Sequence, residues 1–282
     1  MLDTQTVMYG VFGDPIAHSK SPLMLNRAFA EADLNAAYAA FHIRPGTLKD
    51  AVAGIRALGF RGVNVTIPHK VEVMDYLDHL DDGAKAIGAV NTIVNDHGVL
   101  TGYNTDGIGY VRSLKEETGV KLAGAKVVLL GAGGAARGLV YALAKEGAAK
   151  VTLANRTPGR AVELARAMGA YTSTEGIGLD QAKDAVEAAD LVINTTQMGM
   201  HPNVEETPLD SSLLRPGMIV SDIVYNPRET RLLREAKARG AQVHGGLGMF
   251  IYQGAYAFEY WTGLPAPAAA MREAVEQSFS SN

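Results

Sequence analysis

Hydrophobic and polar positions follow two alternating periods along this chain. Short runs rich in Val, Ile and Leu, typical of buried strands, are separated by stretches in which apolar residues recur every three or four positions, as in amphipathic helices. The helical spacing is clear at Leu48, Val52, Ile55 and Leu58. The alternation continues from end to end, and it predicts an α/β fold in which helices cover parallel sheets.

The first hundred residues form one such pattern. We expect strands at residues 7–12, 37–43 and 61–66, a hairpin at 87–94 and 99–103, and helices at 21–33, 47–58 and 106–117. Pro68 is expected to open a short helix after the third strand, so that Lys70 lies in its first turn. Open α/β sheets bind ligands beyond the carboxyl ends of their strands, and Lys70 is therefore a candidate functional residue.

A second α/β pattern begins at Lys126, after a glycine-bounded stretch at residues 119–124. It predicts strands at 126–130, 150–154, 190–194, 218–224 and 241–244, and helices at 135–146 and 229–239. The last two helical segments, 247–261 and 267–279, are expected to return to the first domain. We therefore predict two domains, a substrate-binding and catalytic domain of residues 1–106 plus 246–282 and a Rossmann-like dinucleotide-binding domain of residues 107–245.

A glycine-rich turn joins the strand at 126–130 to the following helix. Gly131, Gly133 and Ala136 occupy the three small positions of the dinucleotide fingerprint, where the chain turns tightly, approaches a pyrophosphate and packs the helix against its strand. A turn without a ligand is the alternative, and the flanking strand and helix favour dinucleotide binding. The candidate cofactor contacts are Gly131, Ala132, Gly133, Gly134 and Ala135.

The end of the next strand indicates which dinucleotide is bound. An NAD site normally has Asp or Glu there for the ribose hydroxyls, whereas this strand ends in Asn155, Arg156 and Thr157. A guanidinium group can bind the 2′-phosphate of NADP through two hydrogen bonds. Arg156, assisted by Asn155, Thr157 and Arg160, therefore predicts NADP, with a solvated basic loop as the alternative.

Composition narrows the classes of function. The chain has a net charge of −4, a pI near 6.0 and no long charge run. This charge pattern favours small molecules over nucleic acid or an anionic membrane as partners. The chain has no cysteine, which excludes disulfides, thiolate catalysis and cysteine-bound zinc. Its histidines, among them His18, His69 and His244, are expected in loops or at helix starts, and no metal site is predicted. We expect a cytoplasmic protein without a signal peptide or membrane-spanning segment.

Lys70 and Asp106 together suggest acid–base chemistry on an alcohol or a ketone. Hydride transfer from carbon requires that the hydroxyl proton go elsewhere, and a lysine within hydrogen-bond range can accept or donate it. Each residue alone is more often a surface charge, but uncharged hydrogen-bonding residues are expected near them at strand ends and helix starts. These residues are Ser19, Ser21, Asn64, Thr66, Asn91, Thr105, Tyr225 and Gln253. The alternatives include a helix cap for Ser21 and packing for Tyr225.

These segments together closely resemble the shikimate dehydrogenase family. The matching motifs follow in order over nearly the whole chain, at residues 13–22, 64–70, 88–92, 104–107, 131–136, 155–157, 194–196, 222–227 and 246–253. One departure stands out, because the family usually has His-Asn shortly after the Ser-Pro pair and this chain has Leu25-Asn26.

The resemblance implies reversible NADP-dependent reduction of 3-dehydroshikimate to shikimate in aromatic amino acid biosynthesis, with Lys70 and Asp106 as the catalytic pair. It implies that Ser19 and Ser21 hold the substrate carboxylate. The other implied contacts are Thr66, Asn91, Tyr225 and Gln253 for substrate, and Asp82, Ile223 and Gly246 for the cofactor. A quinate/shikimate dehydrogenase preferring NAD and a catalytically silent dinucleotide sensor are the alternatives, and the chain is expected to be a monomer or a homodimer.

Overall fold

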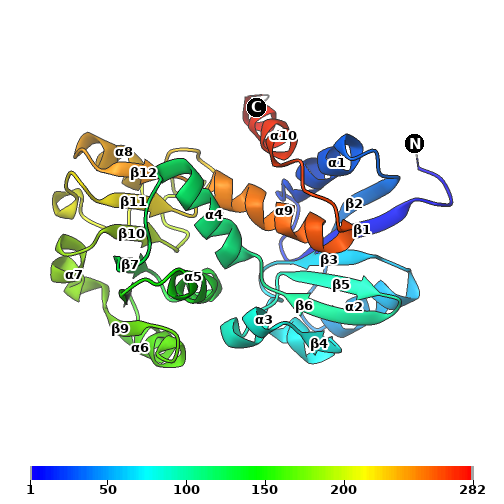
Figure 1. The fold of residues 1–282 in the computed structure, drawn as a ribbon, viewed down its shortest axis with the longest axis horizontal. Helices are drawn as coiled ribbons and strands as arrows, with labels where there is room; N and C mark the ends of the chain where they lie inside the picture. The colour runs from blue at the N-terminus through cyan, green and yellow to red at the C-terminus, as the bar shows by residue number, and fades with distance from the viewer. Residues whose placement is uncertain (1, 281–282) are drawn as a thin grey trace. The chain divides into compact units, whose positions relative to one another are not determined.

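The computed structural model describes residues 2–280 and divides them into two compact units, each with its own sheet (Figure 1). The first unit contains the described residues up to Thr105 and those from Ile251 onward, and the second is Asp106–Phe250. Asp106 and residues 246–250, which we had placed with the substrate domain, thus belong to the second unit. Within residues 2–280, none of the helices combines the length and apolar character needed to cross a membrane.

A mixed sheet forms the centre of the first unit, with six strands in the order β2-β1-β3-β5-β6-β4. The strands are β1 (Val7–Gly13), β2 (Ala36–His42), β3 (Gly62–Val65), β4 (His79–Leu80), β5 (Thr92–Asp96) and β6 (Val99–Tyr103). β2, β1 and β3 are parallel, whereas β5 is antiparallel to β3 and β6. β5 and β6 are joined through His97 and Gly98, whose φ angles of 49° and 94° are those of a type I′ hairpin turn.

Helices cover both faces of this sheet. They are α1 (Ser21–Glu31), α2 (Leu48–Ala57), α3 (Asp82–Ile87), the part of α9 (Leu247–Thr262) from Ile251 onward, and α10 (Ala268–Ser280). α2 buries Leu48, Val52 and Ile55 of the apolar stripe predicted from its spacing, and these residues share one core with the sheet. The fourth predicted residue, Leu58, follows the helix and is exposed. The burial of this stripe, rather than helix propensity, stabilises α2 against the sheet.

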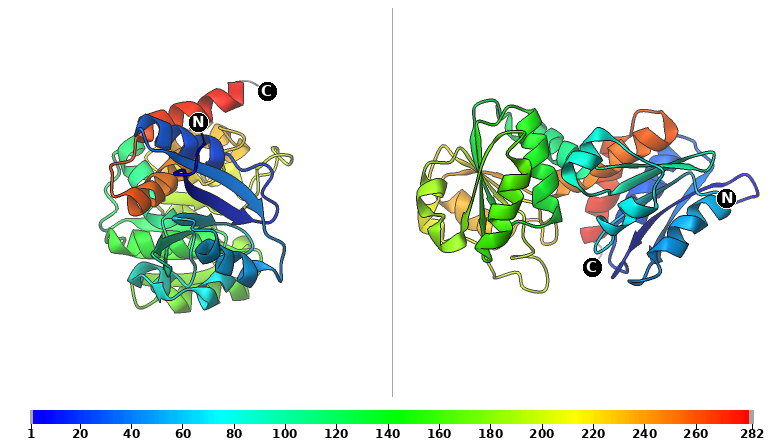
Figure 2. Two further views of the ribbon diagram at one scale, coloured as in Figure 1. Left: turned by 90° about the vertical axis from the view of Figure 1, so that its right-hand side faces the viewer. Right: turned by 90° about the horizontal axis from the view of Figure 1, so that it is seen from below.

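The opposite face of the first sheet is packed with aromatic side chains. α10 lies beside α1 (Figures 1 and 2), and the rings of Tyr9 and Phe29 stack with centroids 4.7 Å apart. Trp261 of α9 donates its indole N–H to the carbonyl oxygen of Ile93 at 2.9 Å. Gly62 faces the Trp261 ring, and a Cβ there would overlap it. The carboxyl-terminal helices are therefore part of the core of the first unit.

A fully parallel sheet forms the centre of the second unit, in the order β12-β11-β10-β7-β8-β9. Its strands are β7 (Lys126–Leu130), β8 (Lys150–Asn155), β9 (Ser173–Gly178), β10 (Leu191–Asn194), β11 (Ile219–Asp222) and β12 (Gln242–His244). This is the order of the doubly wound Rossmann sheet, and it reverses between β7 and β10. The predicted α/β class and Rossmann-like fold are confirmed.

Helices also cover both faces of the second sheet. They are α4 (Asp106–Thr118), α5 (Gly134–Lys145) and α6 (Pro158–Met168) on one face, and α7 (Lys183–Glu187) and α8 (Arg231–Ala238) on the other. α4 approaches α5 so closely that a Cβ on Gly107 would overlap the carbonyl oxygen of Gly138. This contact explains why Asp106, the first residue of α4, lies in the second unit.

Several segments differ from the sequence prediction, which did not include β4, α6, β9 or α7. Helix α3 precedes the hairpin where a strand was predicted to begin, because the Asp81 carboxylate accepts the Ala84 N–H at 2.8 Å and caps the helix. Lys70 lies in a run of turns after β3, not in the first turn of a helix. The His69 N–H there bonds the Thr66 carbonyl three residues back, which forms a turn. A 3₁₀ helix, Glu72–Tyr76, follows.

Candidate active site

The backbone around Lys70 is held from two sides. The Lys70 carbonyl accepts a hydrogen bond of 2.8 Å from the Val90 N–H, which ties this turn to the segment before β5. The neighbouring His69 is buried, and its Nε2 lies 2.6 Å from the carbonyl oxygen of Ile43. These two contacts fix the backbone while the Lys70 side chain stays partly exposed. Thr66, also partly exposed, begins the same turn at the carboxyl end of β3.

Asn64 cross-links three strands of the first unit. Its Oδ1 accepts a hydrogen bond of 2.7 Å from the Tyr38 hydroxyl, and its Nδ2 donates to the Asn91 carbonyl and to Thr92 Oγ1. Burial raises the pKa of Tyr38 well above its usual value, so this hydroxyl stays protonated and donates. The Asn64 amide therefore stabilises the sheet beside Lys70, and its contact with substrate stays a prediction.

Asn91 and Gln253 are brought together through Thr105. The Asn91 amide donates to Thr105 Oγ1 at 2.9 Å, and the Asn91 Oδ1 accepts the Thr105 N–H at 2.8 Å. The Thr105 hydroxyl donates to the Gln253 carbonyl at 3.0 Å. Two strand ends and helix α9 therefore meet at one point of the first unit, next to the segment that leads to Asp106.

Ser19 and Ser21 lie at the amino end of α1. The Ser21 N–H donates to Ser19 Oγ at 3.3 Å, and Ser21 is the first helical residue rather than the cap that we considered as an alternative. Leu25, at the family's usual histidine position, is fully buried as core packing. Asn26 is bonded to the backbone of Tyr38 in both directions, through Nδ2 at 2.9 Å and Oδ1 at 2.8 Å. The departure at Leu25 thus leaves the position of both serines supported.

The predicted substrate residues are divided between the two units. Ser19, Ser21, Asn64, Thr66, Lys70, Asn91 and Gln253 belong to the first unit. Asp106 and Tyr225 belong to the second, and Asp106 is buried at the start of α4. Tyr225 is half-buried and stacks on Phe250, with ring centroids 4.7 Å apart.

The glycine turn of the second unit leaves room for a ligand. Gly131 has a φ of 115°, and a Cβ there would lie 2.6 Å from Thr195 Oγ1, so no larger residue fits. Gly133 and Gly134, by contrast, face open space. α5 begins at Gly134 without a side-chain cap, which leaves its first backbone N–H groups to bind an anion. These features, with the half-buried Ala132 and Ala135, fit the pyrophosphate of a dinucleotide.

A basic group follows the end of β8. The Asn155 amide donates to the Thr157 carbonyl at 2.9 Å and shapes this turn. Arg156 and Arg160 are both exposed, and neither forms an ion pair with a carboxylate of residues 2–280. Two guanidinium groups are thus available to a phosphate at the strand end where a Rossmann fold holds the adenosine ribose.

Asp222 organises the ends of β10 and β11. Its carboxylate accepts hydrogen bonds from the Asn194 amide (3.0 Å), the Val224 N–H (3.0 Å) and the Thr230 hydroxyl (2.7 Å). Burial raises the pKa of the Asp222 carboxyl to about 6, although these three donors oppose the rise. We had not identified Asp222 as a functional residue. Its position at a strand end, as the first residue of the motif at 222–227, could have indicated it.

Ile223 and Gly246 lie close together directly beyond this cluster. A Cβ on Gly246 would overlap the carbonyl oxygen of Ile223, so the two backbones are in contact. The other predicted cofactor residue, Asp82, is exposed at the start of α3 in the first unit and is 3.6 Å from Lys85. Among residues 2–280, no group of three His, Asp or Glu side chains is placed to hold a metal ion.

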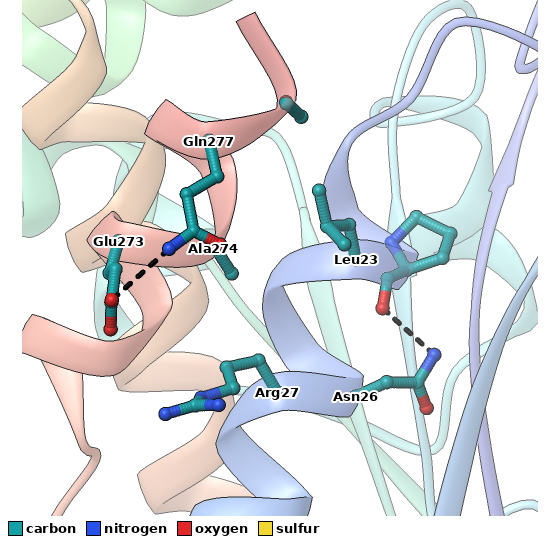
Figure 3. A pocket seen from close by; sticks show the side chains of 8 residues that line it. Leu23, Asn26, Arg27, Glu273, Ala274 and Gln277 are labelled. Atoms are coloured by element: carbon teal, nitrogen blue, oxygen red, sulfur yellow. Dashed lines mark hydrogen bonds between the residues drawn. The ribbon is translucent and has the colours of Figure 1, made fainter. Parts of the chain in front are cut away.

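A separate hollow lies between α1 and α10 of the first unit (Figure 3). Its volume is about 710 Å³, and Arg27 extends from α1 toward α10 across it. Its walls are formed by Pro22, Leu23, Asn26, Arg27, Glu273, Ala274, Gln277 and Ser278. The predicted site residues do not line this hollow, which is therefore distinct from the candidate active site.

Comparison with known proteins assigns the family. Residues 11–93 match the shikimate dehydrogenase substrate binding domain, 113–232 match shikimate/quinate 5-dehydrogenase, and 246–276 match the shikimate 5′-dehydrogenase C-terminal domain.

Full-length relatives and a solved structure agree. The chain is 50% identical to the NADP(+) shikimate dehydrogenase of Geobacillus kaustophilus over 96% of its length and 98% of that protein. It is 51% identical to that of Moorella thermoacetica, over 98% and 95%. A crystal structure of a shikimate dehydrogenase with NADP+ superposes with a TM-score of 0.92 at 43% identity, covering 99% of this chain and 97% of the other. The chain belongs to the shikimate dehydrogenase family.

Proposed function

We propose that this chain catalyses the reversible NADP-dependent reduction of 3-dehydroshikimate to shikimate, a step of aromatic amino acid biosynthesis. One observation carries the choice of cofactor. β8 ends at Asn155 and is followed by Arg156 and Thr157, where an NAD enzyme has an acid. The substrate follows from the family, since relatives sharing half of the sequence are named for this dehydrogenase. We further propose that the protein is cytoplasmic, because the cysteine-free chain suits a reducing compartment. Its proposed oligomeric state is a monomer or a homodimer.

The second unit supplies the residues proposed for NADP. The open space at Gly133 and Gly134 and the uncapped start of α5 suit the pyrophosphate. Arg156 and Arg160 bind the 2′-phosphate, and the contact between Ile223 and Gly246 forms a surface for the nicotinamide. When bound, NADP supplies the hydride, and the residues of the chain handle orientation and the proton.

The proton is assigned to Lys70 and Asp106. As hydride reaches the ketone carbon, negative charge develops on its oxygen, and an ammonium group can donate a proton there. Asp106 orients the hydroxyl of the substrate. Ser19 and Ser21 hold the carboxylate of the substrate. The remaining proposed substrate contacts are Asn64, Thr66, Asn91, Tyr225 and Gln253.

A steady-state assay of the purified protein with two acids and two cofactors tests this function. Shikimate with NADP should give the highest kcat/KM of the four combinations. Faster turnover of quinate with NAD would instead identify a quinate dehydrogenase, and binding of NADP without turnover of either acid would identify a sensor.

Replacing Arg156 with Ala should raise the KM for NADP by about tenfold or more and leave the KM for NAD unchanged. The expected size follows from a hydrogen-bonded contact with a charged group, which contributes about 1.5–3 kcal/mol. Arg166→Ala, which removes the same charge from the exposed last turn of α6, is the matched control. Equal losses with both cofactors would show that Arg156 does not contact the phosphate.

A further inference from the structure

One face of α4 carries polar side chains where the helix is buried. Tyr110, Ser113 and Glu117 follow Asp106 at intervals of four, three and four residues, so all four lie along one side of the helix. Tyr110 and Ser113 are fully buried. A helix that packs on a sheet usually presents apolar side chains on this side.

These side chains meet His244, which is buried at the end of β12, in the short strand predicted at 241–244 and not in a loop or at a helix start. His244 Nδ1 lies 2.9 Å from Ser221 Oγ, and its Nε2 lies 2.8 Å from Ser113 Oγ. The Tyr110 hydroxyl donates to Ser221 Oγ at 2.9 Å. The imidazole therefore bridges a strand residue and a helix residue inside the second unit.

The side chains of this cluster can form one continuous chain of hydrogen bonds, in which each group donates to the next. Ser221 accepts from Tyr110 and can donate to Nδ1 of a neutral His244, whose Nε2–H then donates to Ser113. Ser113 can donate onward to a Glu117 carboxylate oxygen at 3.4 Å. Because Tyr110, Ser113, Ser221 and His244 are buried, removal of one member leaves its neighbours short of one hydrogen-bond partner.

The cluster is placed between groups that we assign to the reaction. Ser221 lies in β11 and His244 in β12, and the loops that follow these strands carry Ile223 and Gly246. Ser113 lies two turns along α4 from Asp106. A Cβ on Gly248 would overlap Ser113 Oγ, so the start of α9 also fits closely against this point. A shift of α4 along the sheet would therefore move Asp106 relative to the nicotinamide-side loops.

We propose that His244 is a positioning residue that, through Ser113 and Ser221, fixes α4 and thereby Asp106 relative to Ile223 and Gly246. The proposal rests on the role assigned to Asp106 above. His244 itself acts through the helix and not on the substrate. Displacing a catalytic group by about 1 Å can lower a rate by up to about 100-fold, which sets the scale of the effect.

A double-mutant cycle on kcat tests this proposal. His244→Ala should lower kcat about tenfold, while the dissociation constant for NADP, measured by titration, stays within about twofold. In an Asp106→Asn background, His244→Ala should cause no further loss, because the group that it positions has already been disabled. Losses that multiply in the double variant would overturn the proposal and assign His244 a general structural role.

A milder variant keeps the test decisive if His244→Ala does not fold. Ser113→Ala removes only the hydroxyl that connects α4 to His244, and it should lower kcat about threefold in the native background and not at all beside Asp106→Asn. An unchanged kcat in folded Ser113→Ala would overturn the proposal. Lys115→Ala is the control and should leave kcat unchanged. Lys115 lies on the exposed side of the same helix, where it forms an ion pair with Glu146.

The single Asp106→Asn variant separates the two levels of inference. If it retains the kcat of the native protein, the proposed role of Asp106 is wrong, and the positioning role of His244 falls with it. If it loses activity while His244→Ala is additive, the proposed function stands and the positioning role alone is overturned.

Discussion

Replacement of Lys70 with Ala is expected to lower turnover of shikimate by about 100-fold or more, while the affinity for NADP changes little. General acid–base catalysis by a positioned side chain contributes about 10²- to 10⁴-fold, and Ala removes the proton carrier without touching the Rossmann unit. The measurement is kcat for shikimate with saturating NADP, together with a binding titration of NADP. The pattern expected is a loss in kcat, because the interaction is made during the chemical step.

Two further variants sharpen this result. Lys70→Arg keeps the positive charge but exchanges its proton far less readily, so it should not restore turnover. Lys49→Ala removes an exposed lysine of α2 in the same unit and should leave kcat unchanged. Near-native turnover of Lys70→Ala would remove Lys70 from the mechanism.

The second large effect is on stability and comes from Asp222. Burial raises the pKa of its carboxyl from the ordinary value of 3.8 to about 6 in the folded chain. A raised carboxyl pKa means that the folded state holds the proton more tightly than the unfolded state. The corresponding stability is fully present below pH 3.8 and is lost as the pH rises through about 6. A shift of about two units corresponds to about 3 kcal/mol.

Urea unfolding of the native chain and Asp222→Asn at several pH values measures this contribution. The stability of the native chain relative to the variant should fall by about 2 kcal/mol between pH 4 and pH 7, which covers most of the titration of Asp222, since Asn cannot titrate. Asp210→Asn is an exposed control with the opposite sign, because the Ser212 backbone N–H lowers the pKa of Asp210. Parallel curves for the native chain and Asp222→Asn would show that Asp222 does not titrate in this range.

The strand positions of the second unit followed well from the sequence, except that of β9, which was not predicted. The predicted strands at 126–130, 150–154 and 190–194 lie within one residue of β7, β8 and β10, because buried parallel strands are continuous apolar runs. Short elements were harder. Helix α3 has too few residues for a helical period, so only its cap Asp81 and its terminal Gly88 mark it in the sequence.

Tertiary contacts account for most of what the sequence left out of the candidate site. Motifs placed Asn64 and Asn91 at strand ends, but the bond from the distant Tyr38 hydroxyl to Asn64 exists only after the sheet has formed. Asp222 and His244 were missed for a related reason. Carboxylates and imidazoles are mostly exposed, and their burial depends on partners that local periodicity does not specify.

The contact between Trp261 and Gly62 also sets an order of events on the ribosome. The first unit needs chain from both ends, whereas the second is one continuous segment and can be completed before α10 and the part of α9 from Ile251 onward have been synthesised. At about 5–20 residues per second, this delay is on the order of ten seconds. A nascent chain that stops before Ile251 therefore leaves the rings of Tyr9 and Phe29 without Trp261 and Phe258, which pack against them in the folded unit. This exposed aromatic surface is a natural target for chaperones until the rest of α9 emerges.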